Sequence, residues 1–72
     1  MPLKPETLVA AAEYGFANVV RDKAFAAYQM ACNGNARPNL IEALQQAHEI
    51  ACDHAKVARR AYLAAVEADP AV

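Results

Sequence analysis

The sequence contains no serine and no tryptophan, and Thr7 is its only threonine. No histidine lies near Thr7 in the sequence, so the chain lacks a hydroxyl nucleophile with a general base beside it. Its only glycines, Gly15 and Gly34, form no glycine-rich loop of the kind that holds phosphate groups at the start of a helix. We therefore expect a protein that is not an enzyme and that needs no cofactor.

The sequence also lacks a long apolar run and a strong charge. No stretch approaches the roughly 18 apolar residues that a membrane-spanning helix needs, and the early run from Leu8 to Ala12 ends at Glu13, too soon for a signal peptide. A net charge of -1, with no basic or acidic tail, disfavours strong non-specific binding to nucleic acid. We expect a cytoplasmic protein with no membrane partner, in which the two cysteines stay free thiols.

Alanine is what the chain has in abundance, at 19 of its 72 positions. Alanine costs the least of all residues to place in a helix, so the composition predicts an all-α fold in one domain, residues 1–72. Alanine also buries little area, and a single core of this size rarely supplies more than roughly 3–5 kcal/mol. Oligomerisation is a usual way to make up the difference.

Proline and glycine divide the chain into two long helices. Pro5 suits the first turn of a helix that runs over about 5–32, a turn follows at 33–38, and a second helix covers about 39–68. A short connection between two long helices predicts an antiparallel helical hairpin.

The ends of these helices carry capping signals. Gly34 or a neighbouring asparagine fits the left-handed position that closes a helix. Asn39 and Glu42 have the spacing of a capping box, which predicts that Asn39 caps the second helix.

Successive helical residues turn by about 100°, and this spacing collects apolar residues into one line on each helix. We expect the two lines to face each other inside the hairpin, with Met30 beside Leu44, Phe16 beside Ala55 and Leu8 beside Tyr62 or Ala65. On the first helix the line, here called the hydrophobic stripe, consists of Leu8, Val9, Ala12, Phe16, Val19, Val20, Ala27 and Met30. On the second helix it consists of Leu40, Leu44, Ala47, Ala51, Ala55, Ala58, Tyr62 and Ala65.

The first helix has a second line of residues on its opposite side. This aromatic seam follows a four-three spacing and consists of Tyr14, Asn18, Arg21, Phe25, Tyr28 and Cys32. The second helix has its own apolar line beside its stripe, here called the flank, which consists of Ala43, Ile50, His54, Val57, Ala61 and Ala64. A two-helix hairpin cannot bury both sides of its first helix, so the aromatic seam is predicted to meet a partner, with Ile50 and Val57 supporting it.

Two kinds of partner fit this prediction. The seam can close a homodimeric four-helix bundle, or it can dock another protein, because aromatic residues and arginine dominate interface hot spots. The two readings can coexist, because a dimer can bury Phe25 and still present Tyr14, Arg21 and Tyr28 at its edge.

A metal or small-ligand site is a remote alternative. His48 and Cys52 are four residues apart and share a helix face, in a segment that resembles half of the zinc motif HExxH. Two ligands are too few for a structural zinc site within one chain, although a dimer could bring four together.

An RNA-binding role is the main rival. Lys56, Arg59 and Arg60 form a small basic cluster, and Arg21 stands between two tyrosines. The size and hairpin layout resemble those of Rop-type plasmid proteins, dimeric four-helix bundles that bind paired RNA loops. This resemblance is architectural, and no Rop motif aligns residue by residue.

These observations lead to one expected function. The chain is expected to be a small homodimeric inhibitor or adaptor that binds another protein, of the kind found among phage and plasmid proteins.

Overall fold

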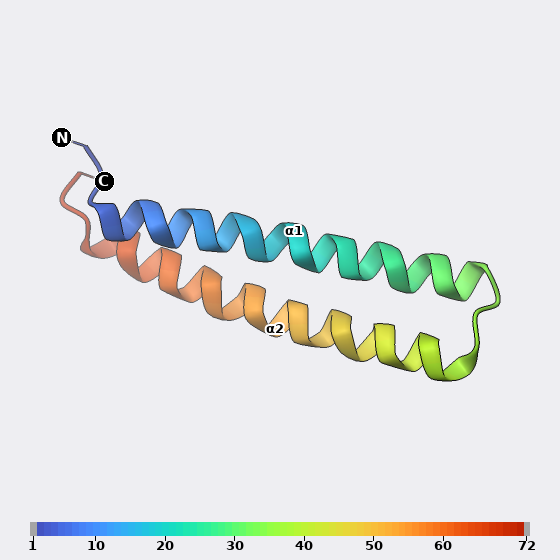
Figure 1. Ribbon diagram of the computed structural model, residues 1–72. Helices are drawn as coiled ribbons and strands as arrows, with labels where there is room; N and C mark the ends of the chain where they lie inside the picture. Colours follow the sequence, from blue (N-terminus) through green and yellow to red (C-terminus); the bar gives the residue numbers. More distant parts are fainter. Residues whose placement is uncertain (1, 72) are drawn as a thin grey trace.

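A computed structural model describes residues 2–71 of the chain. The chain forms two helices, α1 (Pro5–Asn33) and α2 (Pro38–Ala68), which pack side by side as an antiparallel hairpin (Figure 1). The predicted all-α hairpin is confirmed, and both helix boundaries lie within one residue of those predicted.

Both helices begin at a proline without help from a side chain. Lys4 and Arg37 occupy the capping positions in extended conformation, and neither makes a side-chain capping hydrogen bond. The predicted capping box is therefore wrong, because α2 starts one residue earlier than Asn39. Pro38 provides the reason: its fixed φ suits the first helical position, where its missing N–H leaves no hydrogen bond unmade.

The turn between the helices ends α1 with a Schellman motif. The Gly34 N–H donates to the Met30 carbonyl at 2.9 Å, and the Ala36 N–H donates to the Ala31 carbonyl at 3.0 Å. Asn35 takes the left-handed conformation with a φ of 56°, whereas Gly34 has a φ of -89°. The left-handed residue is thus one of the two asparagines rather than the glycine.

The axial register of the hairpin is close to the one predicted, but α1 is rotated about its axis. Thr7 lies against Ala65, near the level predicted for its neighbour Leu8. However, Phe16 and Met30 of the hydrophobic stripe are 72% and 74% exposed. The prediction that this stripe closes the hairpin is wrong, and the side of α1 that carries the aromatic seam faces α2 instead.

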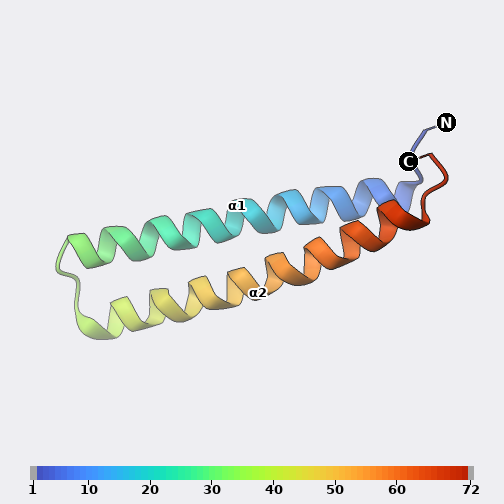
Figure 2. The same ribbon diagram turned by 180° about the vertical axis from the view of Figure 1, so that it is seen from behind.

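The molecule is a rod rather than a globule. Its extents are 53 × 15 × 13 Å, and its radius of gyration of 16.1 Å exceeds the roughly 11 Å expected for a compact domain of this length. Both ends of the described chain lie at the same end of the rod, where the helices are closest, and Figure 2 shows the same arrangement from behind. Neither helix contains an 18-residue stretch apolar enough to cross a membrane.

The interface between the helices holds little apolar mass. Within residues 2–71, the buried hydrophobic residues are Ala10, Ala51 and Ala55, and no large side chain is fully buried. Small side chains allow the two backbones to approach closely. They also leave the hairpin without the large buried side chains that stabilise most domains.

Candidate functional site

The aromatic seam of α1 packs against α2 through two ring contacts. Tyr14 stacks on Tyr62 with ring centroids 5.5 Å apart and planes inclined by 25°. Phe25 lies against the imidazole of His48 with centroids 5.1 Å apart. Because such aromatic pairs add stabilisation beyond the area they bury, these contacts hold this side of α1 against α2, although Phe25 stays 43% exposed. The predicted meeting of the seam with a separate partner stays a prediction, and only the edges of the seam remain available for one.

A polar latch joins the start of α1 to the end of α2. The Asp69 side chain is 3% exposed, and its Oδ2 accepts hydrogen bonds from the Thr7 hydroxyl at 2.7 Å and from the Lys4 N–H at 2.9 Å. Its Oδ1 accepts the N–H of Ala71 at 2.8 Å. These three hydrogen bonds, the Thr7 bond first, lower the pKa of the Asp69 carboxyl below its ordinary value.

This latch explains the rotation of α1. Thr7 must face α2 to reach Asp69, and residues seven apart lie on nearly the same face of a helix. Tyr14, Arg21 and Tyr28 follow Thr7 at intervals of seven, so they turn towards α2 with it. The hydrophobic stripe is consequently left on the outside.

A groove of about 150 Å³ runs between the helices beside the stacked tyrosines. Three of its residues are basic, Arg21 on α1 and Lys56 and Arg59 on α2. The remaining lining residues are Tyr14, Asn18, Cys52 and Ala55. Arg60, which the sequence grouped with Lys56 and Arg59, is exposed and does not line the groove. The fold thus places Lys56 and Arg59, two of the three residues of the predicted basic cluster, beside the aromatic seam.

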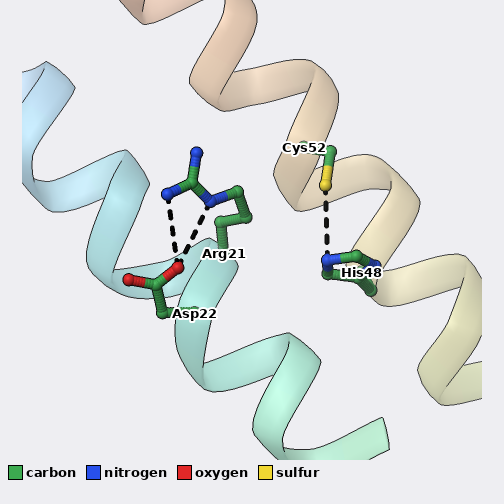
Figure 3. Close-up of polar contacts among 4 residues, drawn as sticks. All are labelled: Arg21, Asp22, His48 and Cys52. Carbon is green, nitrogen blue, oxygen red and sulfur yellow. Dashed lines mark hydrogen bonds and ion pairs between the residues drawn. The ribbon is translucent and has the colours of Figure 1, made fainter.

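The charge of this groove is only weakly compensated. Both Nε and Nη2 of Arg21 donate to Oδ1 of Asp22 at 3.3 Å, on the surface of α1 (Figure 3). In the part of the chain that the structure describes, this is the one ion pair, so Lys56 and Arg59 have no carboxylate partner. An exposed pair such as Arg21–Asp22 contributes little stability. The groove can therefore attract an anionic group.

His48 and Cys52 share a face of α2, as their spacing predicts. The Sγ atom of Cys52 lies 3.4 Å from Nε2 of His48 (Figure 3), and the imidazole also lies against the ring of Phe25. Within residues 2–71, no three His, Cys, Asp or Glu side chains lie close enough together to hold a metal ion. The pair supplies at most two ligands from one chain.

Tyr28 and Cys32 lie near the turn, one helical turn apart on the aromatic seam. Cys32 raises the pKa of the Tyr28 hydroxyl above its ordinary value, first through a side-chain hydrogen bond and then because the negative charge of its thiolate form opposes that of a tyrosinate. Tyr28 is half-buried and Cys32 is exposed. This end of the seam is the part most open to solvent.

Large hydrophobic residues are exposed on both helices. On α2, Ile50 and Val57 of the flank are 58% and 61% exposed, as the sequence predicts. On α1, the hydrophobic stripe is exposed along most of its length. The exposed large hydrophobic residues described are Leu3, Leu8, Val9, Phe16, Val19, Val20, Phe25, Met30, Leu40, Ile50, Val57 and Leu63.

Sequence reasoning missed the Thr7–Asp69 latch. The available signals were the single threonine, seven residues before Tyr14, and an aspartate before a proline at the end of the second helix. Aspartate commonly accepts a hydrogen bond from the N–H two residues on, as Asp69 does from Ala71. Because an antiparallel hairpin brings the start of its first helix to the end of its second, the Thr7 hydroxyl and the Asp69 carboxylate could thus have been paired.

No protein-family model, curated protein or solved structure matches the chain.

Proposed function

We propose that this chain is a small non-enzymatic module that binds another protein and acts as an inhibitor or adaptor. One observation carries the proposal: twelve large hydrophobic side chains are exposed, whereas only alanines are buried among the apolar residues described. Exposed apolar surface on this scale is typical of an interaction site. The proposal includes a homodimeric state and a cytoplasmic location, where both cysteines remain thiols.

The flank of α2 is the surface that we assign to the target protein. Ile50 and Val57 project from it two helical turns apart, and the alanines around them leave room for larger side chains of a partner. A polar face of α2 lies beside the flank and supplies the charged rim that interfaces commonly have; it consists of Glu42, Glu49, Asp53, Lys56, Arg60 and Glu67.

Substitution on the flank tests this assignment. The immobilised chain should capture its target from a lysate of the native host, and Val57→Asp should weaken capture about tenfold or more, because a buried charge replaces an apolar contact. Gln45→Asp introduces the same charge at an exposed position of α2 outside the flank, and it should leave capture unchanged. Equal capture by all three proteins would exclude the flank as the target site.

A second candidate function, RNA binding of the Rop type, is favoured by the groove. Arg21, Lys56 and Arg59 gather there beside Tyr14, an arrangement that suits phosphate groups and unpaired bases. Affinity for RNA hairpins should then fall steeply with salt, and Arg59→Gln should reduce the slope by about 1. Arg60→Gln, outside the groove, should reduce it less. A flat salt dependence would exclude this function.

A further inference from the structure

Five residues of the hydrophobic stripe, together with Lys23 and Ala26, form a regular heptad line on α1. Val9, Ala12, Phe16, Val19, Lys23, Ala26 and Met30 alternate spacings of three and four residues, and all seven are exposed. This is the spacing with which one helix packs along another. Larger side chains alternate with smaller ones along the line, a pattern that allows two such helices to interdigitate.

The two helices differ in how much of their circumference is apolar. α2 has an entirely polar face, formed by Glu42, Glu49, Asp53, Lys56, Arg60 and Glu67, all exposed. α1 has no comparable face, since the aromatic seam packs on α2 and the heptad line lies on the opposite side. A helix with apolar residues on two sides is suited to the middle of an assembly, and a helix with one polar face to its periphery.

The chain exposes more surface than a compact protein of its mass, by about the area that one partner buries in an interface. The chain exposes 5362 Å², whereas a compact protein of 7.7 kDa exposes about 4,300 Å². The difference of about 1,000 Å² is close to the roughly 800 Å² that each partner buries in a standard interface.

We propose that the heptad line of α1 packs antiparallel against the same line of a second copy, so that two α1 helices form the centre of the dimer and two α2 helices flank them. The inference rests on the proposed function, because it divides the exposed apolar surface: α1 binds the second copy, and the flank of α2 stays free for the target.

Charge and size select the antiparallel orientation. In a parallel pair each residue meets its own counterpart, which places Lys23 against Lys23 of the second copy. In an antiparallel pair centred near Arg21, Phe16 lies opposite Ala26 of the second copy, and Ala12 lies opposite Met30. Large side chains then face small ones, and Lys23 lies opposite Val19 of the second copy rather than opposite another Lys23.

Light scattering on the purified chain, without any target, tests the dimer. The native chain should have a mass of about 15 kDa, twice the chain mass of 7.7 kDa. Phe16→Asp should raise the dissociation constant of the dimer a hundredfold or more, giving monomer or unfolded chain. Val57→Asp and Gln45→Asp should remain dimers. A monomeric native chain, or a dimer that Phe16→Asp leaves intact, would overturn the proposal.

Disulfide cross-linking tests the orientation without destabilising the core. In a background with Cys32→Ala and Cys52→Ala, the double variant Ala12→Cys/Met30→Cys should form a covalent dimer on oxidation, and neither single variant should. A covalent dimer from Ala12→Cys alone would show the parallel orientation, and no cross-link in any variant would remove α1 from the interface. Target capture by the flank is measured separately, so loss of the dimer and loss of the proposed function remain distinguishable.

Discussion

Asp69 is a buried carboxylate, and its burial is offset by hydrogen bonds to its ionised form. The Thr7 hydroxyl and two backbone N–H groups point at its two oxygens. Hydrogen bonds to a charged form favour that form, which is why the pKa of this carboxyl lies below its ordinary value. A single residue thus links the first turn of α1 to the end of α2.

The pH dependence of stability follows from the direction of this shift. A carboxyl whose pKa is lower in the folded chain than in the unfolded chain stabilises the fold above the unfolded value of about 3.9. This contribution is lost as the pH falls through the folded pKa of Asp69. We expect the unfolding midpoint in urea to fall when the pH is lowered from neutral through this range.

Two substitutions isolate the latch from the other carboxyl groups. Asp69→Asn should remove part of the acid dependence, and Thr7→Val should raise the pKa of Asp69 towards its ordinary value, as followed by the carboxyl carbon resonance in NMR. Glu67→Gln, an exposed change two residues away, is the matched control and should preserve the acid dependence. An unchanged Asp69 pKa in Thr7→Val would show that the hydroxyl does not hold the carboxylate.

At the scale of the elements, the sequence predicts the helices and their register but not the rotation of α1. Proline positions and the four-three spacing locate both helices to within a residue, since these are local properties of the chain. The rotation depends on a contact between residues far apart in sequence, Thr7 and Asp69. The hydrophobic stripe and the aromatic seam of α1 have similar helical spacing, and the higher apolar content of the stripe favoured it as the side that packs on α2. In the structure Phe16 of the stripe is exposed, and Tyr14 of the seam stacks on α2.

Of the candidate surfaces, the sequence could predict the flank of α2 but not the groove between the helices. Exposure of Ile50 and Val57 could be predicted because α2 has one clear polar face, which fixes where its apolar residues lie. The groove could not be predicted, because it forms only where Arg21 of α1 lies beside Lys56 and Arg59 of α2. Such a meeting requires the rotation as well as the register.

The turn provides a prediction for a single element. Asn35 holds the left-handed conformation that closes α1, and most residues with a Cβ adopt it only at a cost. Asn35→Ala should therefore destabilise the chain by about 1 kcal/mol, whereas Asn35→Gly should be neutral or stabilising, as measured by urea unfolding. Asn33→Ala, two residues earlier and inside α1, should not share this loss. Equal effects of Asn35→Ala and Asn35→Gly would show that the backbone conformation is not the cause.

At the scale of the whole molecule, the buried alanines and the end latch give one hairpin little with which to offset the conformational entropy of its chain. Folding and association should therefore be linked, and the thermal midpoint should depend on protein concentration. A tenfold increase in concentration contributes about 1.4 kcal/mol per dimer, which should raise the midpoint by roughly 3–5 °C in circular dichroism melts. The covalently linked Ala12→Cys/Met30→Cys dimer is the control and should melt at one temperature at every concentration, because its two chains cannot separate. A midpoint of the native chain that stays fixed over a hundredfold range of concentration would mean that one hairpin is stable alone, and that its exposed apolar surface serves only other proteins.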